Sequence, residues 1–311
     1  MRRVDAIVVG GGVLGAAAAW ALARQGRETI LYEQFEIGHA RGSSHGDSRV
    51  FRLAYPQTEY VRLAQEALET WRLLEDAAGE PLLLTTGGLY AGAWAEACGA
   101  ALASCGISRA WLPAAEAAER FPAMRFDELE RVLWQDDGGI CLADRAIAAL
   151  VRLAGAGGVE IREHQEVEHV LLDDQGIMVA TPSERVTAPV VVVAAGTWAG
   201  GLLSQLAIEL PLRPAFTQVS YFEPPAGQTP APLPTFVESD LEDVGLGTGG
   251  YWIPPHGEQT AIKVGAGVPG HTVDPAMGPF EPDAGRLQRD IGFVERRLPA
   301  FSAEPVATDT C

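Results

Sequence analysis

Residues 4–33 read VDAIVVGGGVLGAAAAWALARQGRETILYE, and this stretch decides the fold. The apolar residues 4–9 predict a buried strand, and the Ala-rich residues 16–24 predict a helix. Residues 29–32 are apolar again and predict a second strand. A strand, a helix and a second strand within about 30 residues are typical of a β-α-β unit with parallel strands.

The turn between the first strand and the helix is rich in glycine. Gly10, Gly12 and Gly15 fit the spacing GxGxxG, and Glu33 ends the second strand. Glycines in these positions let the backbone approach a pyrophosphate, which the positive end of the helix dipole attracts. A carboxylate at Glu33 accepts hydrogen bonds from ribose hydroxyls and repels a 2′-phosphate, which disfavours NADP. The sequence therefore predicts a dinucleotide site at this turn.

The composition is that of a globular protein with an acidic surface. The chain has 311 residues, of which 47% are hydrophobic and 21% are charged, and its formal net charge is −18. Such a charge repels phosphate backbones and anionic lipids, so we expect neither a nucleic-acid partner nor a membrane partner. The four cysteines show no metal-ligand spacing and no disulfide pattern, so we expect no metal site and a cytoplasmic location.

Segments of two kinds alternate along the chain. Residues 1–80 and 142–211 carry helix and parallel-strand patterns, and within them residues 189–196, PVVVVAAG, predict a strand that is buried on both faces. Residues 81–141 and 212–306 carry shorter strands and a β-rich pattern with prolines, which is typical of an antiparallel sheet. We therefore expect an α/β protein in which a doubly wound, Rossmann-like nucleotide-binding domain is interleaved with a domain built on a mixed or antiparallel β-sheet.

A second motif follows the β-α-β unit. Residues 42–46 read GSSHG and also satisfy the GxSxG pattern of serine hydrolases. That pattern requires its serine on a tight turn directly between a strand and a helix, whereas Ser44 lies well past the preceding predicted strand. We therefore favour a loop on which His45, Arg49 and Arg52 bind an anion.

The longer stretch GSSHGDSRVFRLAY, residues 42–55, resembles the signature of the monomeric sarcosine oxidase and N-methyl amino acid oxidase family, a group of D-amino-acid-oxidase-like flavoenzymes. The similarity extends to residues 190–198, to residues 212–214, to Lys263 and to Cys311. The resemblance implies an FAD-dependent amine oxidase. Such an enzyme oxidises an N-methyl or cyclic secondary amino acid to an imine and reduces O2 to H2O2.

The resemblance also implies which residues hold the cofactor. The residues that it places against FAD are Gly10, Gly12, Gly15, Glu33, Ser48, Arg49 and, beside the adenine, Val167. Cys311 matches a cysteine that forms a thioether with the 8α-methyl group of the flavin. The resemblance therefore implies that FAD is attached covalently through this residue.

Cationic side chains receive the catalytic and substrate-binding roles. The resemblance places His45 and Arg49 against the isoalloxazine, where positive charge favours the anionic reduced flavin. It pairs Arg52 with the substrate carboxylate, which the guanidinium fork suits. Lys263 is the only lysine of the chain and lies in an apolar stretch that predicts a strand. The resemblance assigns it the activation of O2 through a fixed positive charge.

Two positions of the implied substrate pocket depart from the sarcosine-specific pattern. Trp252 stands where a tyrosine is expected, and Gly267 stands where a histidine is expected. Replacing an imidazole by hydrogen opens space and removes a polar group. We therefore expect a secondary amine that is bulkier or less polar than sarcosine.

The chain ends at Cys311, whereas the family continues beyond this point. Residues 307–311 are therefore interpreted as the start of a further segment of the FAD-binding domain. Two alternatives to the oxidase stay open: an inactive FAD-binding fragment, and a flavin dehydrogenase that passes electrons to an acceptor other than O2. The expected partners of the oxidase are a small amino-acid-like amine and O2, and the expected state is a monomer.

Overall fold

The computed structural model describes residues 2–173, 176–240, 249–267, 270–278 and 280–311 of the chain. The predicted β-α-β unit is present at the N-terminus, where helix α1 (Val13–Arg24) connects two parallel strands. They lie at the centre of a parallel sheet with the strand order β10 (Glu160–Arg162), β3 (Thr29–Tyr32), β2 (Ala6–Val9) and β14 (Val190–Val193). The predicted α/β fold class is confirmed.

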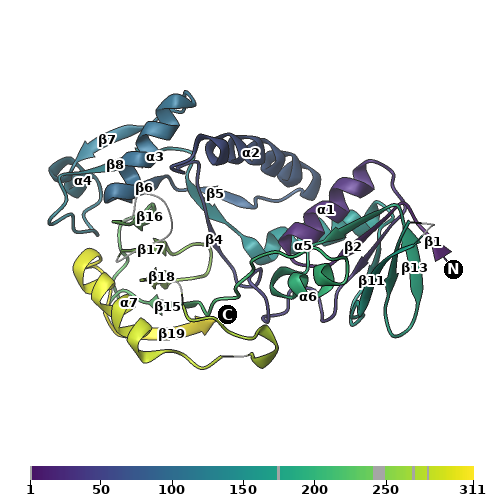
Figure 1. Cartoon of the computed structure of the whole chain (residues 1–311). Helices are drawn as coiled ribbons and strands as arrows, with labels where there is room; N and C mark the ends of the chain where they lie inside the picture. The colour runs from purple at the N-terminus through teal and green to yellow at the C-terminus, as the bar shows by residue number, and fades with distance from the viewer. Residues whose placement is uncertain (1, 174–175, 241–248, 268–269, 279) are drawn as a thin grey trace.

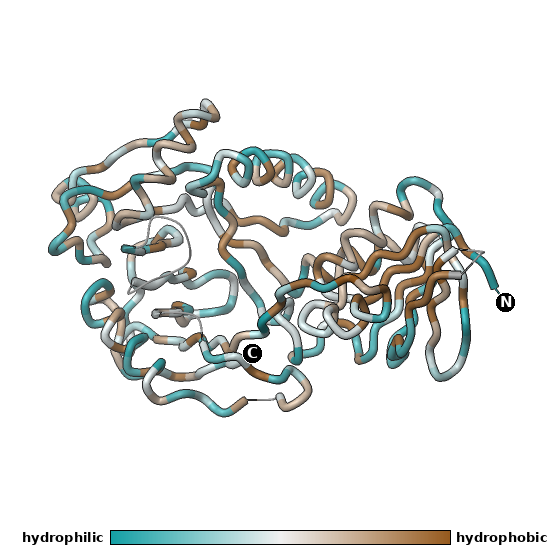
Figure 2. Tube along the Cα trace, in the orientation of Figure 1, coloured by the Kyte–Doolittle hydropathy of each residue, from teal (hydrophilic) through white to brown (hydrophobic). Residues whose placement is uncertain are grey.

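This parallel sheet is the middle one of three layers. On one face, Val8 and Leu31 pack against α1 and helix α5 (Ala143–Ala156). On the other face, Ile7 and Val9 pack against a second sheet. The strands of the second sheet, in order, are β1 (Arg2–Arg3), β13 (Arg185–Ala188), β12 (Gly176–Ala180) and β11 (His169–Asp173). Figure 2 shows that the strands of this lobe are predominantly hydrophobic, as expected for a sheet covered on both sides.

Two details of this lobe differ from the sequence prediction. The long helices α1 and α5 lie on one face of the parallel sheet, whereas on the other face the second sheet, with Leu202 of a short helix at residues 199–204, takes the place of the helices of a doubly wound fold. Residues 189–196 were predicted to form a fully buried strand, but Val190 is 49% exposed and Val191–Val193 are half-buried. The reason is topological, since β14 lies at the edge of the sheet and pairs only with β2.

An eight-stranded sheet forms the second lobe (Figure 1). Its strands, in order, are β19 (Pro305–Thr310), β15 (Gln218–Phe222), β18 (Ile262–Ala266), β17 (Gly250–Ile253), β16 (Thr235–Glu238), β6 (Gly88–Ala91), β8 (Arg131–Gln135) and β7 (Ala110–Pro113). Only β16 and β6 run parallel, so the sheet is mixed. Residues 307–310, which the sequence assigned to the FAD-binding domain, belong here to the edge strand β19.

The two faces of this sheet have different surroundings. Phe236, Trp252 and Val264 face helix α7 (Ala284–Arg297) and form a core with its apolar side chains. Helix α4 (Ala114–Arg120) contributes to the same core. The residues next in sequence point the opposite way, because side chains alternate along a strand. On that face helix α3 (Ala93–Ser104) covers one part of the sheet and leaves the rest open.

A small sheet and a long helix lie between the two lobes (Figure 1). The sheet has the strand order β4 (Arg49–Phe51), β9 (Gly139–Cys141) and β5 (Leu83–Thr85), and the helix is α2 (Thr58–Ala78). The short elements are α6 (Ala199–Ser204), η1 (Gly196–Trp198) and η2 (Pro275–Met277). None of the described helices is both long and apolar enough to cross a membrane. The GSSHGDSR motif runs into β4, and a hydrogen bond from Lys263 of β18 to the carbonyl of Ser48 joins the motif to the second lobe.

A buried carboxylate fastens α7 to the face of the eight-stranded sheet that it covers. Asp290 is 1% exposed, and its two oxygens accept hydrogen bonds from Ser220 Oγ at 2.6 Å and from the backbone N–H of Ala266 at 2.8 Å. Burial raises the pKa of Asp290 to about 6, although these bonds and the nearby Arg286 and Arg289 act in the opposite direction. The end of β18 is therefore held by a group that titrates near neutrality.

The pKa of Asp290 predicts a pH-dependent stability. A carboxyl whose pKa is higher in the folded state adds stability that is complete below its ordinary pKa of 3.8 and is lost as the pH rises through about 6. This shift corresponds to about 3 kcal/mol. The side chain of Asp290→Asn stays neutral. In urea unfolding, we therefore expect the free energy of unfolding of this variant to lack the decrease that the wild type shows between pH 4 and pH 7. The control is the exposed Asp274→Asn. Parallel curves for wild type and Asp290→Asn would contradict the assignment.

Candidate active site

A cavity of about 590 Å³ lies between the open face of the eight-stranded sheet and the GSSHGDSR loop. The residues of the sequence prediction that line it are His45, Ser48, Arg49, Arg52, Lys263, Gly267 and Cys311. These residues come from three distant parts of the chain: strand β4 with the residues on either side of it, strand β18 with the residue after it, and the residue after β19. The structure therefore brings the predicted catalytic residues together in one place.

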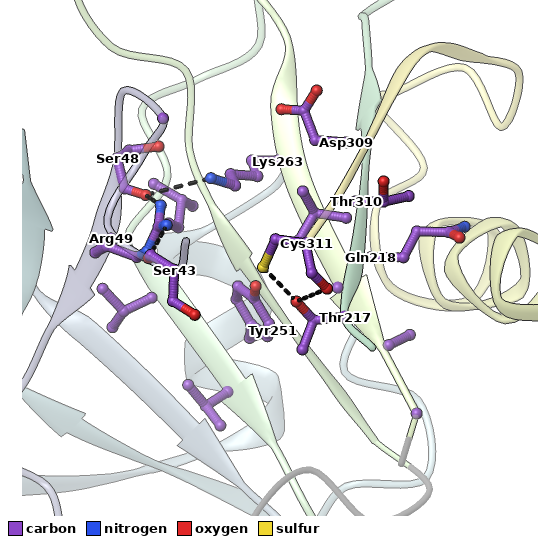
Figure 3. A pocket seen from close by; sticks show the side chains of 18 of the residues that line it. Ser43, Ser48, Arg49, Thr217, Gln218, Tyr251, Lys263, Asp309, Thr310 and Cys311 are labelled. Atoms are coloured by element: carbon purple, nitrogen blue, oxygen red, sulfur yellow. Dashed lines mark hydrogen bonds between the residues drawn. The ribbon is translucent and has the colours of Figure 1, made fainter. Parts of the chain in front are cut away.

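Lys263 projects from the centre of β18 into the cavity. Its side chain is buried, and its ammonium Nζ donates a hydrogen bond to the backbone carbonyl of Ser48 at 3.3 Å (Figure 3). The ring of Tyr221 lies beside it, with the centroid 5.9 Å from Nζ. Burial, followed by the charge of Arg49, lowers the pKa of Lys263. Within the described part of the chain, no carboxylate pairs with this ammonium.

Arg49 organises the loop that faces Lys263. Its guanidinium donates hydrogen bonds to the backbone carbonyls of Ser48 at 2.8 Å, Ser43 at 2.7 Å and His45 at 2.6 Å. The ring of His45 is held in turn by a contact of 2.5 Å between its Nδ1 and the carbonyl of Gly42. Because Arg49 and Lys263 both bind the carbonyl of Ser48, two cationic groups meet on one wall of the cavity (Figure 3).

Arg52 follows β4 and reaches the same cavity from the side of α3. Within the described ranges, no hydrogen bond or ion pair involves its guanidinium. Its neighbours are instead aromatic rings. A cation that lines a cavity and has no carboxylate partner is able to bind an anionic ligand.

Cys311 lies at the opposite wall from Arg49, and its sulfur faces the cavity (Figure 3). Its backbone N–H donates to the carbonyl of Thr217 at 3.0 Å, and the N–H of Thr217 donates to the carbonyl of Cys311 at 2.8 Å. The thiol Sγ lies 2.8 Å from Thr217 Oγ1. The chain end is therefore fixed in place, with its sulfur available to a bound group.

Trp252 does not line the cavity, contrary to the expectation from the sequence. Its indole N–H donates to the carbonyl of Pro234 at 3.1 Å, and its ring stacks on Phe236 with centroids 4.3 Å apart, on the α7 face of the sheet. Tyr251 lines the cavity instead. An offset of one residue in a strand moves a side chain to the opposite face, which is the reason for the error.

Gly267, the other expected substrate contact, does line the cavity. Its φ of +91° lies in the region that favours glycine, and a Cβ atom there would be 2.8 Å from Arg289 Nε. Backbone conformation and lack of space therefore both oppose a side chain at this position.

Sequence reasoning missed several polar residues that line the cavity or, like Tyr221, contact its lining residues. Tyr221 lies opposite Lys263 in the sheet register and donates through its hydroxyl to Asp309 Oδ2 at 2.8 Å. Burial, followed by this hydrogen bond, raises the pKa of Tyr221. Thr217 and Tyr251 were missed in the same way. The alternation of side chains along each strand was a usable signal, but it identifies cavity residues only when the pairing of the strands is known.

The glycine turn has the geometry of a nucleotide cradle. Gly10 has φ +103°, and a Cβ atom on Gly15 would lie 1.8 Å from the carbonyl oxygen of Gly10, so neither position tolerates a side chain. The buried Glu33 accepts hydrogen bonds from the backbone N–H of Gly11 at 2.7 Å and of Phe35 at 2.9 Å. The turn is thus compact, and an acidic side chain is fixed beside it.

One contact links this turn to the cavity. Gly12 precedes α1, and Ser44 Oγ accepts a hydrogen bond of 3.1 Å from the first helical N–H, that of Val13. Because the neighbouring residues of the same loop line the cavity, the loop runs from the helix N-terminus to Lys263. Val167 is buried in the core against the parallel sheet. These residues fit a dinucleotide that begins at the glycine turn and reaches the cavity.

Comparisons with known proteins agree with this geometry. The family model described as "FAD dependent oxidoreductase" matches residues 5–311. Peroxisomal sarcosine oxidase of Mus musculus is 31% identical over an alignment that covers 99% of this chain and 80% of that protein. Monomeric sarcosine oxidase of Arthrobacter sp. is 29% identical, with coverage of 100% and 81%. The structure of NikD, described as an unusual amino acid oxidase, superposes with a TM-score of 0.86 at 26% identity, with coverage of 100% and 81%.

Proposed function

Because the chain belongs to the family of FAD-dependent oxidoreductases, we propose that it is an amine oxidase whose substrate is an N-methyl or cyclic secondary amino acid. The proposed products are an imine and hydrogen peroxide. Support for this substrate class comes from the sarcosine oxidases among the relatives, since sarcosine is N-methylglycine. A monomer in the cytoplasm is the proposed state.

One observation carries the proposal. Within the described residues, the cavity brings together a buried ammonium at Lys263 and a guanidinium at Arg52, and no carboxylate forms an ion pair with either group. Both cations line the same cavity, so their charge is available to a bound ligand. The two cations suit a reaction in which one of them binds an anionic substrate and the other stabilises negative charge that develops on a second reactant.

Each cavity residue has a proposed part in this reaction. When bound, FAD accepts a hydride equivalent from the carbon beside the amine and supplies two electrons to dioxygen. Arg52 binds the carboxylate and orients the amine. Arg49 and His45 place positive charge against the isoalloxazine, and Lys263 stabilises the charge that develops on dioxygen. The glycines at 10, 12 and 15, with Glu33, Ser48 and Val167, hold the nucleotide.

The substrate is proposed to be larger or less polar than sarcosine. Of the two positions on which the sequence based this expectation, only Gly267 lines the cavity. Further support comes from apolar side chains in the same lining, namely Val50, Val237 and Ile253. A substituent on the α-carbon has apolar surface to contact in such a cavity.

The direct test is an assay of the FAD-loaded chain with a panel of secondary amino acids. We would compare kcat/KM for sarcosine, N-methyl-L-tryptophan and L-proline from the rate of hydrogen peroxide formation. Peroxide formation with a higher value for either bulkier amine supports the proposal. Reduction of an artificial dye without peroxide would favour a dehydrogenase, and failure to retain FAD would favour an inactive fragment.

Cys311 provides an independent prediction. The fixed position of its sulfur supports a thioether to the flavin, so we expect yellow colour to remain in the protein pellet after acid precipitation. Cys311→Ser should release the flavin to the supernatant, because an alcohol is a much weaker nucleophile than a thiol. The matched control is Cys105→Ser, since that thiol lies outside the cavity, 3.7 Å from the carbonyl of Thr58. Flavin in the wild-type supernatant would refute covalent attachment.

A further inference from the structure

The guanidinium of Arg52 lies between two aromatic rings. Its Cζ is 4.7 Å from the ring centroid of Tyr55 and 4.8 Å from that of Trp94. Tyr55 belongs to the loop after β4, and Trp94 belongs to the first turn of α3. Both rings also line the cavity. The two segments approach Arg52 from different parts of the chain, so the arrangement is a product of the tertiary fold.

The Trp94 ring is a rigid support. Its side chain is 3% exposed, and its backbone N–H donates to the carbonyl of Ser239 at 3.2 Å. The preceding Gly92 has φ +81°, and a Cβ atom there would lie 2.2 Å from the same carbonyl. The ring of Tyr90 packs behind Trp94, with centroids 5.9 Å apart. The start of α3 is therefore locked against the end of β16, and the indole has little freedom to move.

A second ring supports Tyr55 in the same way. The ring of Tyr60, in the first turn of α2, lies 5.8 Å from it. Tyr60 thus supports the ring of Tyr55, which itself contacts the guanidinium. Because Tyr55 is half-buried whereas Trp94 is buried, the indole is expected to contribute more.

The contrast with Arg297 shows what the rings do for Arg52. Arg297 is equally part of the second lobe, and Glu238 holds it with two hydrogen bonds of 2.9 and 2.7 Å. That pairing fixes the guanidinium but also uses its charge and its donors. Aromatic faces fix a guanidinium through its plane and leave the N–H edge without a partner. Arg52 is held in this second way and therefore keeps its donors for a ligand.

We propose that Trp94 and Tyr55 are positioning residues, which hold the guanidinium of Arg52 in the orientation that receives the carboxylate of the substrate. The proposal rests on the proposed function, in which Arg52 binds that carboxylate. Arginine has a flexible side chain, and ordering it at the moment of binding costs affinity. The two rings order it in advance. Their removal should therefore weaken the binding of carboxylates and leave neutral ligands unaffected.

The test measures binding, without turnover, by titration calorimetry of the FAD-loaded protein. The probes are benzoate and its neutral analogue benzamide. We expect Trp94→Leu to weaken benzoate roughly tenfold and Tyr55→Leu roughly threefold, with benzamide unchanged. Trp94→Phe keeps an aromatic face and should restore most of the benzoate affinity. The matched control is Trp111→Leu, which removes the ring 4.3 Å from the guanidinium carbon of Arg131, outside the cavity.

Arg52→Gln separates failure of this inference from failure of the proposed function. If Arg52→Gln leaves benzoate binding intact, Arg52 does not bind the carboxylate, and both the assigned role and the inference are wrong. If Arg52→Gln abolishes binding while Trp94→Leu behaves like Trp111→Leu, only the inference is overturned. Equal weakening of benzoate and benzamide in Trp94→Leu would also overturn it, because loss of cavity shape affects both probes.

Discussion

We expect the replacement of Lys263 with Met to slow the reaction of the reduced enzyme with dioxygen by about 10²–10³-fold. Lys263 is 7% exposed, and among the described residues its ammonium donates one hydrogen bond, to the carbonyl of Ser48. In such a poorly solvated place, a fixed positive charge strongly stabilises negative charge that develops on a nearby oxygen molecule. Methionine has a similar length and no charge. Stopped-flow mixing of the anaerobically reduced protein with oxygenated buffer measures the rate directly.

The reductive half-reaction is the control for this variant. Reduction of the enzyme by substrate should change by only a few-fold, because Arg52 still binds the carboxylate. Lys263→Arg keeps the charge and should recover part of the lost rate. An oxygen reaction as fast in Lys263→Met as in the wild type would instead indicate a dehydrogenase with a different acceptor.

The pH dependence of the oxygen reaction follows from the lowered pKa of Lys263. The lysine is charged below that pKa and neutral above it, so the rate is highest at low pH and falls as the pH rises through the pKa. The fall occurs at a lower pH than the ordinary lysine value of 10.5, because burial disfavours the ammonium. Lys263→Met should show no such fall.

Local sequence patterns predicted the first lobe well. The strand at 29–32 coincides with β3, and Gly10 and Gly15 occupy positions where a side chain does not fit. The restriction at Gly15 comes from the nearby Gly10, whereas a Cβ atom on Gly10 would lie 2.5 Å from the carbonyl oxygen of the distant Ala194. The burial of residues 189–196 was overestimated because an apolar strand looks the same at the centre and at the edge of a sheet. Strand order is a long-range property that no local pattern contains.

The candidate site was predictable in its charged residues and not in the residues around them. Lys263 stood out as the only lysine of the chain in an apolar stretch, and Arg52 stood out by its place in the motif at residues 42–55. Trp94 and Tyr55 gave no such signal, since an aromatic residue near a helix start is normally part of the core. Trp252 was misplaced by a single position, which in a strand exchanges the cavity face for the core face. Tyr251 therefore takes the place in the cavity that was expected for its neighbour.

Replacing Arg52 with Gln should raise the KM for an N-methyl amino acid by about 10²-fold or more. The loss is large because the substrate carboxylate would enter the cavity without the guanidinium of Arg52, which no hydrogen bond or ion pair among the described residues engages. Arg52→Lys keeps the charge but lacks both the planar fork and the flat faces that the two rings contact, so we expect an intermediate KM. Steady-state kinetics at fixed oxygen concentration give these values.

A matched arginine outside the cavity shows whether the effect is specific. The guanidinium carbon of Arg120 lies 4.1 Å from the ring centroid of Trp134, so Arg120→Gln removes a comparable contact between a cation and a ring without touching the cavity. Its KM should equal that of the wild type. The carboxamide of the same substrate provides the second comparison, because it lacks the charge that Arg52 recognises. Arg52→Gln should abolish the preference for the acid over the amide. If both substrates lose the same factor, Arg52 shapes the cavity and does not read the charge, and the anion that the cavity receives must be sought at Arg49 or Lys263.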